Sequence, residues 1–164
     1  MRHDIAQTSN GATVYVNLLQ SHAGTQISQQ PYLLGLVKEL AQRLAPQTAE
    51  VRLDHDMGRD IGYTYVVETT EKDTILYAQR TRDDIFTRFV KNGKPLSTRY
   101  LTVILRRDAD GAYELHDTWI GRLTPPRPGS TTETSSSKSY WANHAFVFDG
   151  QSLQLRTVTK VCPY

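Results

Sequence analysis

The sequence has little of what several classes of protein require. Its 164 residues include one cysteine, Cys162, which excludes an internal disulfide and a metal site made of cysteines alone. No stretch approaches the ~20 apolar residues that a membrane-spanning helix needs. The first residues, Met1 to Asp4, lead into polar sequence and not into the apolar segment of a secretory signal. We therefore expect a cytoplasmic protein that makes no contact with a membrane.

Signature motifs of common enzyme classes are also missing. The sequence contains no phosphate-binding Walker loop, no dinucleotide-binding glycine fingerprint, no His-Glu-x-x-His zinc motif and no Gly-x-Ser-x-Gly nucleophile motif. We expect no cofactor and no resident metal ion. Any functional residues must therefore be identified from the chemistry of individual side chains.

The net charge is small, but one window is one-sided. The formal charge is only +2 at pH 7. The window from Phe86 to Arg107 has no Asp or Glu and contains six basic residues: Arg88, Lys91, Lys94, Arg99, Arg106 and Arg107. Such a window can attract an anionic partner. It can equally protect strand edges against aggregation, because exposed lysine and arginine discourage edge pairing.

The apolar pattern predicts one helix followed by many strands. Apolar residues make up 38% of the chain, which is enough for one globular domain over residues 1–164. Pro31 to Ala45 repeats leucine and valine at spacings of three and four, which predicts an amphipathic helix ended by Pro46. Short β-branched segments separated by turns predict strands at 12–19, 62–69, 74–80, 85–91, 99–107, 112–121, 144–148 and 152–160.

Short connections between these strands favour antiparallel neighbours. The turn at Asp149-Gly150 further predicts that residues 145–148 pair with residues 152–155. The predicted class is α+β, with one main helix packed on a twisted, mostly antiparallel sheet of about six to seven strands. Residues 20–30 are polar and predict a loop, and residues 123–139 predict a long Pro/Ser/Thr-rich loop that is either functional or mobile.

A first cluster of side chains suited to chemistry lies at residues 54–60. His55 suits a general base and Arg59 suits an anion, whereas Asp54 and Asp56 share one face of an extended segment and suit a hard cation. A polar turn whose acids accept hydrogen bonds from the backbone explains the same residues equally well.

Two further clusters follow. Tyr140 and Trp141 precede His144, which predicts a stacking platform beside an acid/base group, or else a buried tryptophan that anchors the preceding loop. Strand alternation places His116 on one polar face with Arg106 of the preceding strand, together with Glu114 and Thr118. An ordinary solvated sheet face is the alternative for this third cluster.

Two resemblances cover longer parts of the chain. The strings Phe89–Pro95, Trp119–Gly129 and Ser137–Phe148 look like those of a family of small, uncharacterised bacterial proteins, and this likeness implies no activity. The order of a helix and then antiparallel strands, with a Thr-bearing strand from His116 to Gly121, resembles the barnase–EndoU–colicin–RelE group of metal-independent ribonucleases. This second resemblance spans residues 31–121 and implies RNA cleavage, although the chain contains no catalytic string of that group.

Three functional hypotheses result. A metal-independent endoribonuclease needs a base, an acid and cations around the phosphate that the 2′-hydroxyl attacks. The predicted catalytic residues are His55, His116 and His144, the predicted phosphate-binding residues are Arg59, Arg88, Lys91 and Arg106, and the predicted base-stacking residues are Tyr140 and Trp141. The alternative is a non-enzymatic binding module for RNA or a protein, which uses the polar sheet face and residues 123–139. A metal-dependent hydrolase at Asp54 and Asp56 is the third hypothesis.

Overall fold

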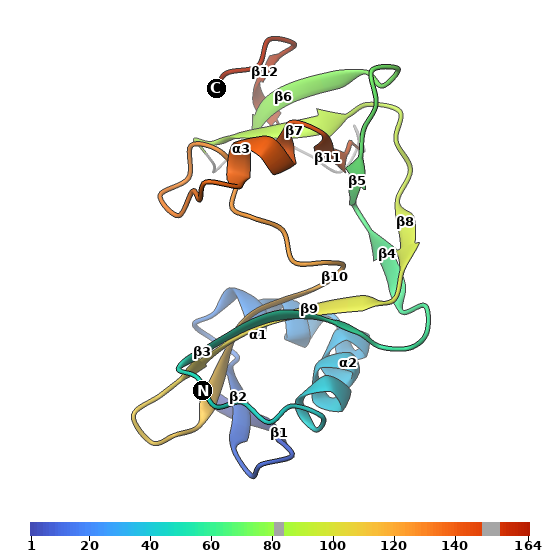
Figure 1. Ribbon diagram of the computed structural model, residues 1–164. Helices are drawn as coiled ribbons and strands as arrows, with labels where there is room; N and C mark the ends of the chain where they lie inside the picture. Colours follow the sequence, from blue (N-terminus) through green and yellow to red (C-terminus); the bar gives the residue numbers. More distant parts are fainter. Residues whose placement is uncertain (81–83, 149–154) are drawn as a thin grey trace. The chain divides into compact units, whose positions relative to one another are not determined.

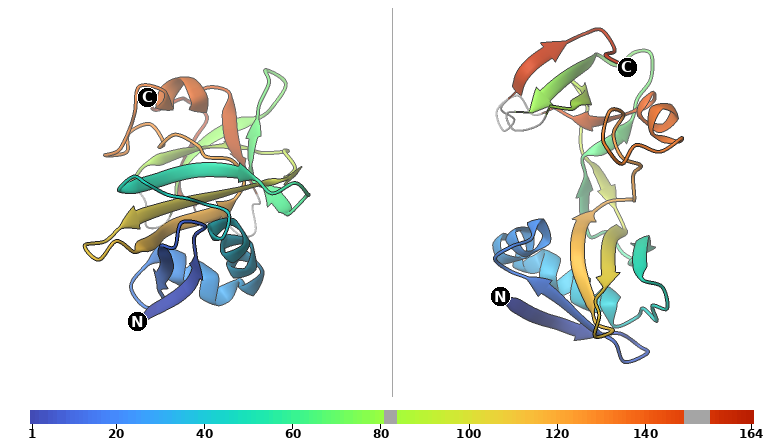
Figure 2. Two further views of the ribbon diagram at one scale, coloured as in Figure 1. Left: turned by 60° about the horizontal axis from the view of Figure 1, so that its bottom comes forward. Right: turned by 90° about the vertical axis from the view of Figure 1, so that its left-hand side faces the viewer.

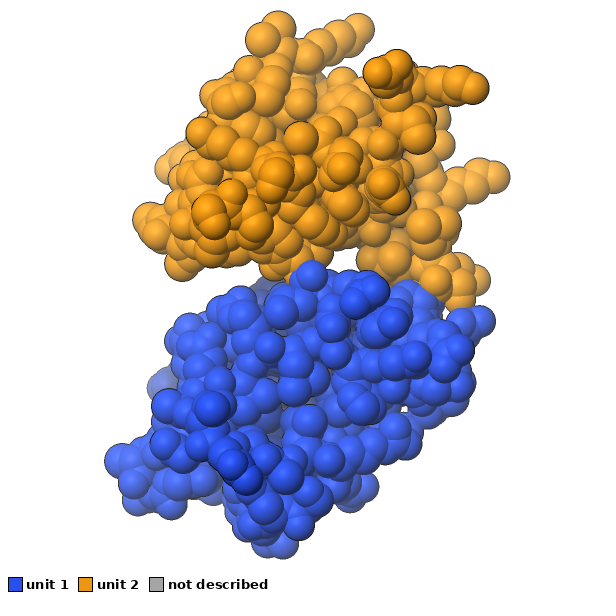
Figure 3. Space-filling model, viewed as in Figure 1, with its two compact units in different colours: residues 1–62, 98–123 blue, residues 63–97, 124–164 orange. Residues whose placement is uncertain are grey.

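The computed structural model describes residues 1–80, 84–148 and 155–164 (Figure 1). The chain divides into two compact units, which Figure 3 colours separately. Unit 1 comprises Met1–Gly62 and Thr98–Leu123, and unit 2 comprises Tyr63–Ser97 and Thr124–Tyr164. Each unit is therefore assembled from two separate stretches of sequence. The expectation of one globular domain over residues 1–164 stays a prediction.

Unit 1 is built on a five-stranded sheet with the strand order β1-β2-β10-β9-β3. The neighbours are antiparallel except for β10 and β2, which run parallel. The strands are β1 Arg2–Gln7, β2 Thr13–Asn17, β3 Glu50–Asp56, β9 Tyr100–Arg107 and β10 Tyr113–Ile120. The sequence does not predict β1 and β3, because both lie at sheet edges and charged residues interrupt their apolar alternation.

Two helices, α1 (His22–Gln29) and α2 (Pro31–Ala41), pack on strands of this sheet (Figure 2). The predicted helix corresponds to α2, which buries the apolar stripe that includes Leu33, Leu36 and Leu40. This stripe joins the inward-facing residues of the central strands in one core.

Helix α1 lies where the polar sequence predicts a loop. Ser21 caps its N-terminus, because the Ser21 side chain accepts a hydrogen bond from the Gly24 amide. A Cβ atom at Gly24 would lie 2.1 Å from the carbonyl oxygen of Asn17, so this glycine allows α1 to approach β2 closely. Gly24 is therefore required for packing. The prediction of a loop at residues 20–30 is wrong because it treats this glycine as a helix breaker.

A β-bulge at His116 changes which side chains share a face of β10. Leu115 lies opposite Leu105, but the next paired residue is Asp117, which lies opposite Ile104. Because one residue is inserted, the alternation reverses beyond this point. Thr118 consequently lies opposite Val103 in the core and is fully buried, whereas Glu114 lies opposite Arg106. The predicted polar face of β10 is thus divided between the two sides of the sheet.

Unit 2 contains a second five-stranded sheet with the order β12-β6-β7-β11-β5. Its strands are antiparallel except for β11 and β7. They are β5 Val66–Glu68, β6 Ile75–Arg80, β7 Phe86–Val90, β11 His144–Val147 and β12 Leu155–Thr159, and a short helix α3, Ser137–Trp141, precedes β11. A separate two-stranded sheet joins β4, Gly62–Thr64, to β8, Leu96–Thr98.

The predicted fold class is wrong. Strands account for 41% and helices for 15%, and the described residues form three sheets and three short helices, not one main helix on one sheet. The mostly antiparallel character is confirmed. The predicted turn at Asp149-Gly150 and its pairing fall on residues 149–154, outside the described residues, and the described strand β12 pairs with β6. Among the helices that the structure describes, none has the length and apolar character to cross a bilayer.

Candidate functional site

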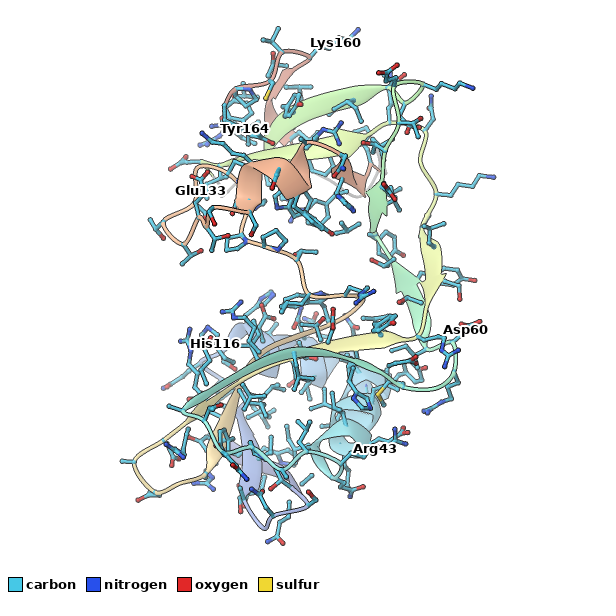
Figure 4. All side chains as sticks on the ribbon, viewed as in Figure 1. Arg43, Asp60, His116, Glu133, Lys160 and Tyr164 are labelled. Carbon is cyan, nitrogen blue, oxygen red and sulfur yellow. The ribbon has the colours of Figure 1, made fainter. Side chains whose placement is uncertain are left out.

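The three predicted catalytic histidines do not come from one unit. His55 and His116 lie on β3 and β10 of unit 1, and His144 begins β11 of unit 2. His55 lies opposite Leu101, a core residue, whereas His116 occupies the β10 bulge and is exposed (Figure 4). Strand spacing separates these two positions by on the order of 15 Å, because they differ by two strands and by four residues along the sheet. Unit 1 therefore does not place His55 and His116 within reach of one substrate atom.

Two of the predicted phosphate-binding arginines already have carboxylate partners. Arg59 donates two hydrogen bonds to Glu39 of α2, at 2.9 and 2.8 Å, and Arg43 donates a third at 2.9 Å. The hydrogen bond from Arg59 lowers the pKa of Glu39 below its ordinary value. Arg106 has its Nε atom 3.9 Å from Glu50. These arginines have the arrangement of surface ion pairs, which neutralise much of their charge.

The aspartates of the first cluster likewise already have hydrogen-bond partners within the chain. Asp54 accepts hydrogen bonds from the Leu123 amide at 2.9 Å and from Arg122 at 3.3 Å. Asp56 accepts from the Gly58 amide at 2.8 Å and from Arg99 at 3.0 Å, and the Gly58 amide contributes most to lowering the pKa of Asp56. In the part of the chain that the structure describes, no group of three His, Cys, Asp or Glu side chains could hold a metal ion.

The predicted cluster of aromatic residues around His144 is present in the structure. The Tyr140 ring stacks on the His144 imidazole, with 3.9 Å between ring centroids and an interplanar angle of 5°. Trp141 is only 2% exposed, stacks on Phe146 at 5.2 Å and donates from its indole nitrogen to the Pro125 carbonyl at 3.0 Å. In this placement Trp141 anchors the 123–139 segment, and Tyr140 is the more accessible aromatic residue.

The contacts of His144 determine which of its ring nitrogens carries a proton. Its Nδ1 atom lies 2.9 Å from the Tyr140 carbonyl oxygen and 2.7 Å from the Asn143 side-chain oxygen. A carbonyl oxygen only accepts hydrogen bonds, so Nδ1 is the donor and Nε2 of the neutral ring keeps its lone pair. Glu68 lies directly opposite His144 in the β5–β11 register, which brings a carboxylate to the same face of the sheet.

The segment 123–139 is fixed at several points within unit 2. Arg127 donates a hydrogen bond to the Thr87 hydroxyl, and the Ser137 side chain is fully buried. Residues 131–136 form its exposed part, and all but Glu133 carry a hydroxyl group. The predicted loop is thus a structured connection that ends in α3.

The two units carry different charge. Unit 1 contains nine Lys or Arg against ten Asp or Glu, whereas unit 2 contains ten against seven. Within the described part of unit 2, Lys91 and Lys94 are exposed and make no ion pair, and the buried Arg88 also makes none. Sequence reasoning predicts Arg88 and Lys91 as phosphate-binding residues, and it misses two exposed tyrosines, Tyr63 and Tyr65.

No family model, no curated protein and no solved structure matches this chain. The resemblance to metal-independent ribonucleases therefore stays a prediction.

Proposed function

We propose that the protein binds single-stranded RNA through a surface of unit 2 formed by Tyr63, Tyr65, Lys91 and Lys94, called here the tyrosine–lysine surface. The observation that supports this most directly is the exposure of the two tyrosines, 61% and 58%, in the unit whose nearby lysines have no carboxylate partner among the described residues. Exposed aromatic rings beside uncompensated cations are the features that single-stranded nucleic acid recognition uses.

The backbone brings Tyr65, Lys91 and Lys94 to one end of the second sheet, and Tyr63 lies two residues before Tyr65 on β4. The Tyr65 carbonyl accepts a hydrogen bond from the Val147 amide at 2.7 Å, and Val147 lies opposite Val90 of β7. Lys91 follows Val90 directly, and the turn that carries Lys94 lies against the side chains of Val90 and Val147 at Gly93. A Cβ atom at Gly93 would lie 2.7 Å from a methyl group of Val90, so glycine allows this tight return.

The chemistry of the surface fits a flexible strand better than a duplex. A base presents a π-face to a tyrosine ring whatever its identity, whereas phosphates on either side meet the lysine ammonium groups. Each base–aromatic stack contributes about 1–3 kcal/mol. We therefore expect affinity with little sequence preference and with a strong dependence on salt concentration.

The direct test is fluorescence anisotropy with a short labelled single-stranded RNA. Tyr65→Ala should weaken binding by about tenfold, because it removes one stacking platform. The double variant Lys91→Ala/Lys94→Ala should reduce the slope of log Kd against log salt by about 1.4, since about 0.7 is lost for each phosphate contact in single strands. The double variant Lys38→Ala/Lys138→Ala removes two exposed lysines elsewhere and should leave the slope unchanged. If both double variants reduced the salt slope equally, the binding would come from the overall positive charge and not from the tyrosine–lysine surface, which would contradict the proposal.

RNA cleavage is the second candidate, and the fixed tautomer of His144 favours it. A neutral imidazole with its proton held at Nδ1 presents Nε2 as a proton acceptor, as a general base for the 2′-hydroxyl requires. The imidazolium formed by this proton transfer can return the proton to the leaving oxygen, Glu68 on the opposite strand would stabilise the imidazolium, and Arg127 lies near the same face through Thr87. This candidate retains His144 from the predicted catalytic residues and does not need His55 or His116.

Incubation of the protein with mixed-sequence RNA in EDTA tests this second candidate. Cleavage should give products ending in a 2′,3′-cyclic phosphate, and His144→Ala should abolish it. Binding by His144→Ala, measured by anisotropy, should persist and thereby show that the variant is folded. His55→Ala is the matched control and should cleave normally. RNA that stays intact at high protein concentration would leave binding as the only function proposed.

A further inference from the structure

One cation in unit 2 is buried without a counter-charge. Arg88 lies on β7, and only 9% of its surface is exposed. Its Nη1 atom donates to the Thr69 hydroxyl at 2.8 Å and to the His144 carbonyl at 3.0 Å. Its Nε atom is fully buried and has no hydrogen-bond partner among the described residues. The guanidinium group is therefore held in place by neutral oxygens that satisfy only part of its donor capacity.

This arrangement differs from that of an ordinary buried arginine. A guanidinium group keeps its charge at every physiological pH, and burying that charge without an anion is costly. Within the described residues no carboxylate forms an ion pair with Arg88. Among the described residues, the missing component of the group is thus an anion, which a bound ligand would supply.

Two phenol groups, those of Tyr77 and Tyr164, also lie near Arg88. Tyr77 of β6 lies directly opposite Arg88, and its hydroxyl group interacts with both the guanidinium and the thiol of Cys162. The ring of Tyr164 (Figure 4) packs edge-on against Tyr77, with 5.9 Å between centroids. Burial is the main cause that raises the pKa of Tyr77, and burial also raises the pKa of Tyr164 to about 12. Both phenols consequently remain protonated at neutral pH and can donate to an anion.

We propose that Arg88 and Tyr77 form the binding site of a small oxyanion of the phosphate class. The planar guanidinium fork can bind two oxygens of one anion, and the Tyr77 hydroxyl supplies a donor from the neighbouring strand. A tetrahedral phosphate has oxygens left for this additional donor, whereas the two oxygens of a carboxylate are both occupied by the fork. The site uses none of the residues of the tyrosine–lysine surface, and it does not rest on the proposed RNA binding.

Cys162 provides a natural reporter of this site, because it is the single cysteine of the chain and contacts Tyr77. Its thiol is exposed, so iodoacetamide should alkylate it in the folded protein. Sodium phosphate at constant ionic strength should slow the alkylation in a saturable manner, and sodium chloride and acetate should not. Isothermal titration calorimetry of the full chain with phosphate should give the same dissociation constant.

Substitutions then identify the residues that bind the anion. Arg88→Gln should weaken phosphate binding at least tenfold, and Tyr77→Phe should weaken it several-fold while leaving the ring and its packing in place. Circular dichroism establishes whether each variant is folded, and Tyr77→Phe keeps the test valid if Arg88→Gln does not fold. Arg107→Gln is the matched control, because Arg107 is an exposed arginine outside the site. Lys91→Ala/Lys94→Ala should leave phosphate binding unchanged, which separates this site from the RNA surface.

The source of the anion is resolved by comparing phosphate, uridine 5′-monophosphate and uridine. Equal binding of the first two identifies free phosphate as sufficient, and much tighter binding of the nucleotide identifies a phosphate ester as the ligand. Binding of uridine as tight as that of its monophosphate would overturn the proposal. The absence of saturable phosphate binding up to about 10 mM would also overturn the proposal, because a dissociation constant above this limit corresponds to very weak binding.

Discussion

Unit 1 and unit 2 each surround a five-stranded sheet, but they bury apolar surface very differently. Unit 1 has one continuous core of seventeen buried residues, to which both helices and four strands contribute. In the described part of unit 2, the buried apolar residues form two clusters of three, on opposite faces of the sheet. Unit 2 supplements these clusters with stacked aromatic rings and buried hydrogen bonds. Unit 1 thus has the character of a stable scaffold.

The treatment of charge follows the same division. The arginines of unit 1 pair with carboxylates, as Arg59 does with Glu39 and Arg99 with Asp56. Unit 2 also pairs Arg156 with Asp84, but it holds Arg88 among neutral partners and leaves Lys91 exposed without an ion pair among the described residues. Uncompensated positive charge creates a field that attracts anions, whereas paired charge does not. The comparison supports the proposal that unit 2 is the part of the chain that binds anions.

The largest expected change in stability comes from removing Trp141 from the aromatic stack of unit 2. Trp141→Ala should lower the free energy of unfolding by about 3–5 kcal/mol, because it leaves a large cavity beside Phe146. Hydrogen exchange should show the loss of protection in unit 2, with the amides of β9 and β10 still protected. Leu101→Ala, in the core of unit 1, is the matched control and should give the reverse pattern. Loss of protection throughout the chain in both variants would show that the two units unfold as one.

An intermediate effect is expected from a buried hydroxyl of unit 1. Thr118 is fully buried and donates to the Thr102 carbonyl at 2.8 Å. Thr118→Val keeps the shape but removes the donor, so the free energy of unfolding should fall by about 1–2 kcal/mol in urea titration. Thr131→Val, in the exposed part of the 123–139 segment, should change it by less than about 0.5 kcal/mol. A Thr118→Val variant as stable as the parent would contradict the reversal of alternation at the His116 bulge.

The smallest effect concerns the surface ion pair that joins α2 to residue 59. The folded-state pKa of Glu39 is lowered, so its stabilising contribution exists above the unfolded pKa and disappears as pH falls through the folded pKa. Arg59→Ala should therefore lower the free energy of unfolding only slightly at pH 7 and almost not at all in acid, where Glu39 is protonated. An NMR titration should show the pKa of Glu39 rising towards its ordinary value of 4.5 in the variant. A cost that is independent of pH would point to lost packing by the arginine stem.

Local pattern predicts several elements of this fold correctly. Helix α2 and strands β6, β7, β9 and β10 lie within or close to their predicted ranges, because each alternation or helical stripe is complete within the segment itself. The assembly of two units was not predictable in this way. Strand β9 pairs with β3, which lies about fifty residues earlier, and no local feature encodes that partner.

The candidate site was predictable only in part. The proximity of Tyr140, Trp141 and His144 follows from their closeness in sequence, and a short helix brings their rings together. His55 and His116 could meet only if they shared a face of the sheet, and their positions on β3 and β10 do not place them on one face. The Arg88 group combines strands β6 and β7 with the segment after β12, so the signal for it exists only in the folded chain.

The division of each unit into two stretches of sequence affects biosynthesis. While the chain emerges from the ribosome, α1 and α2 are complete long before β9 and β10, the strands against which much of their apolar surface packs. Unit 2 begins next, yet it waits for β11, so both nascent halves display uncovered leucine and valine at the same time. Fusion of the two unit 1 stretches by a short linker in place of residues 63–97 would bring β9 and β10 out of the ribosome sooner after α2 and so shorten that delay.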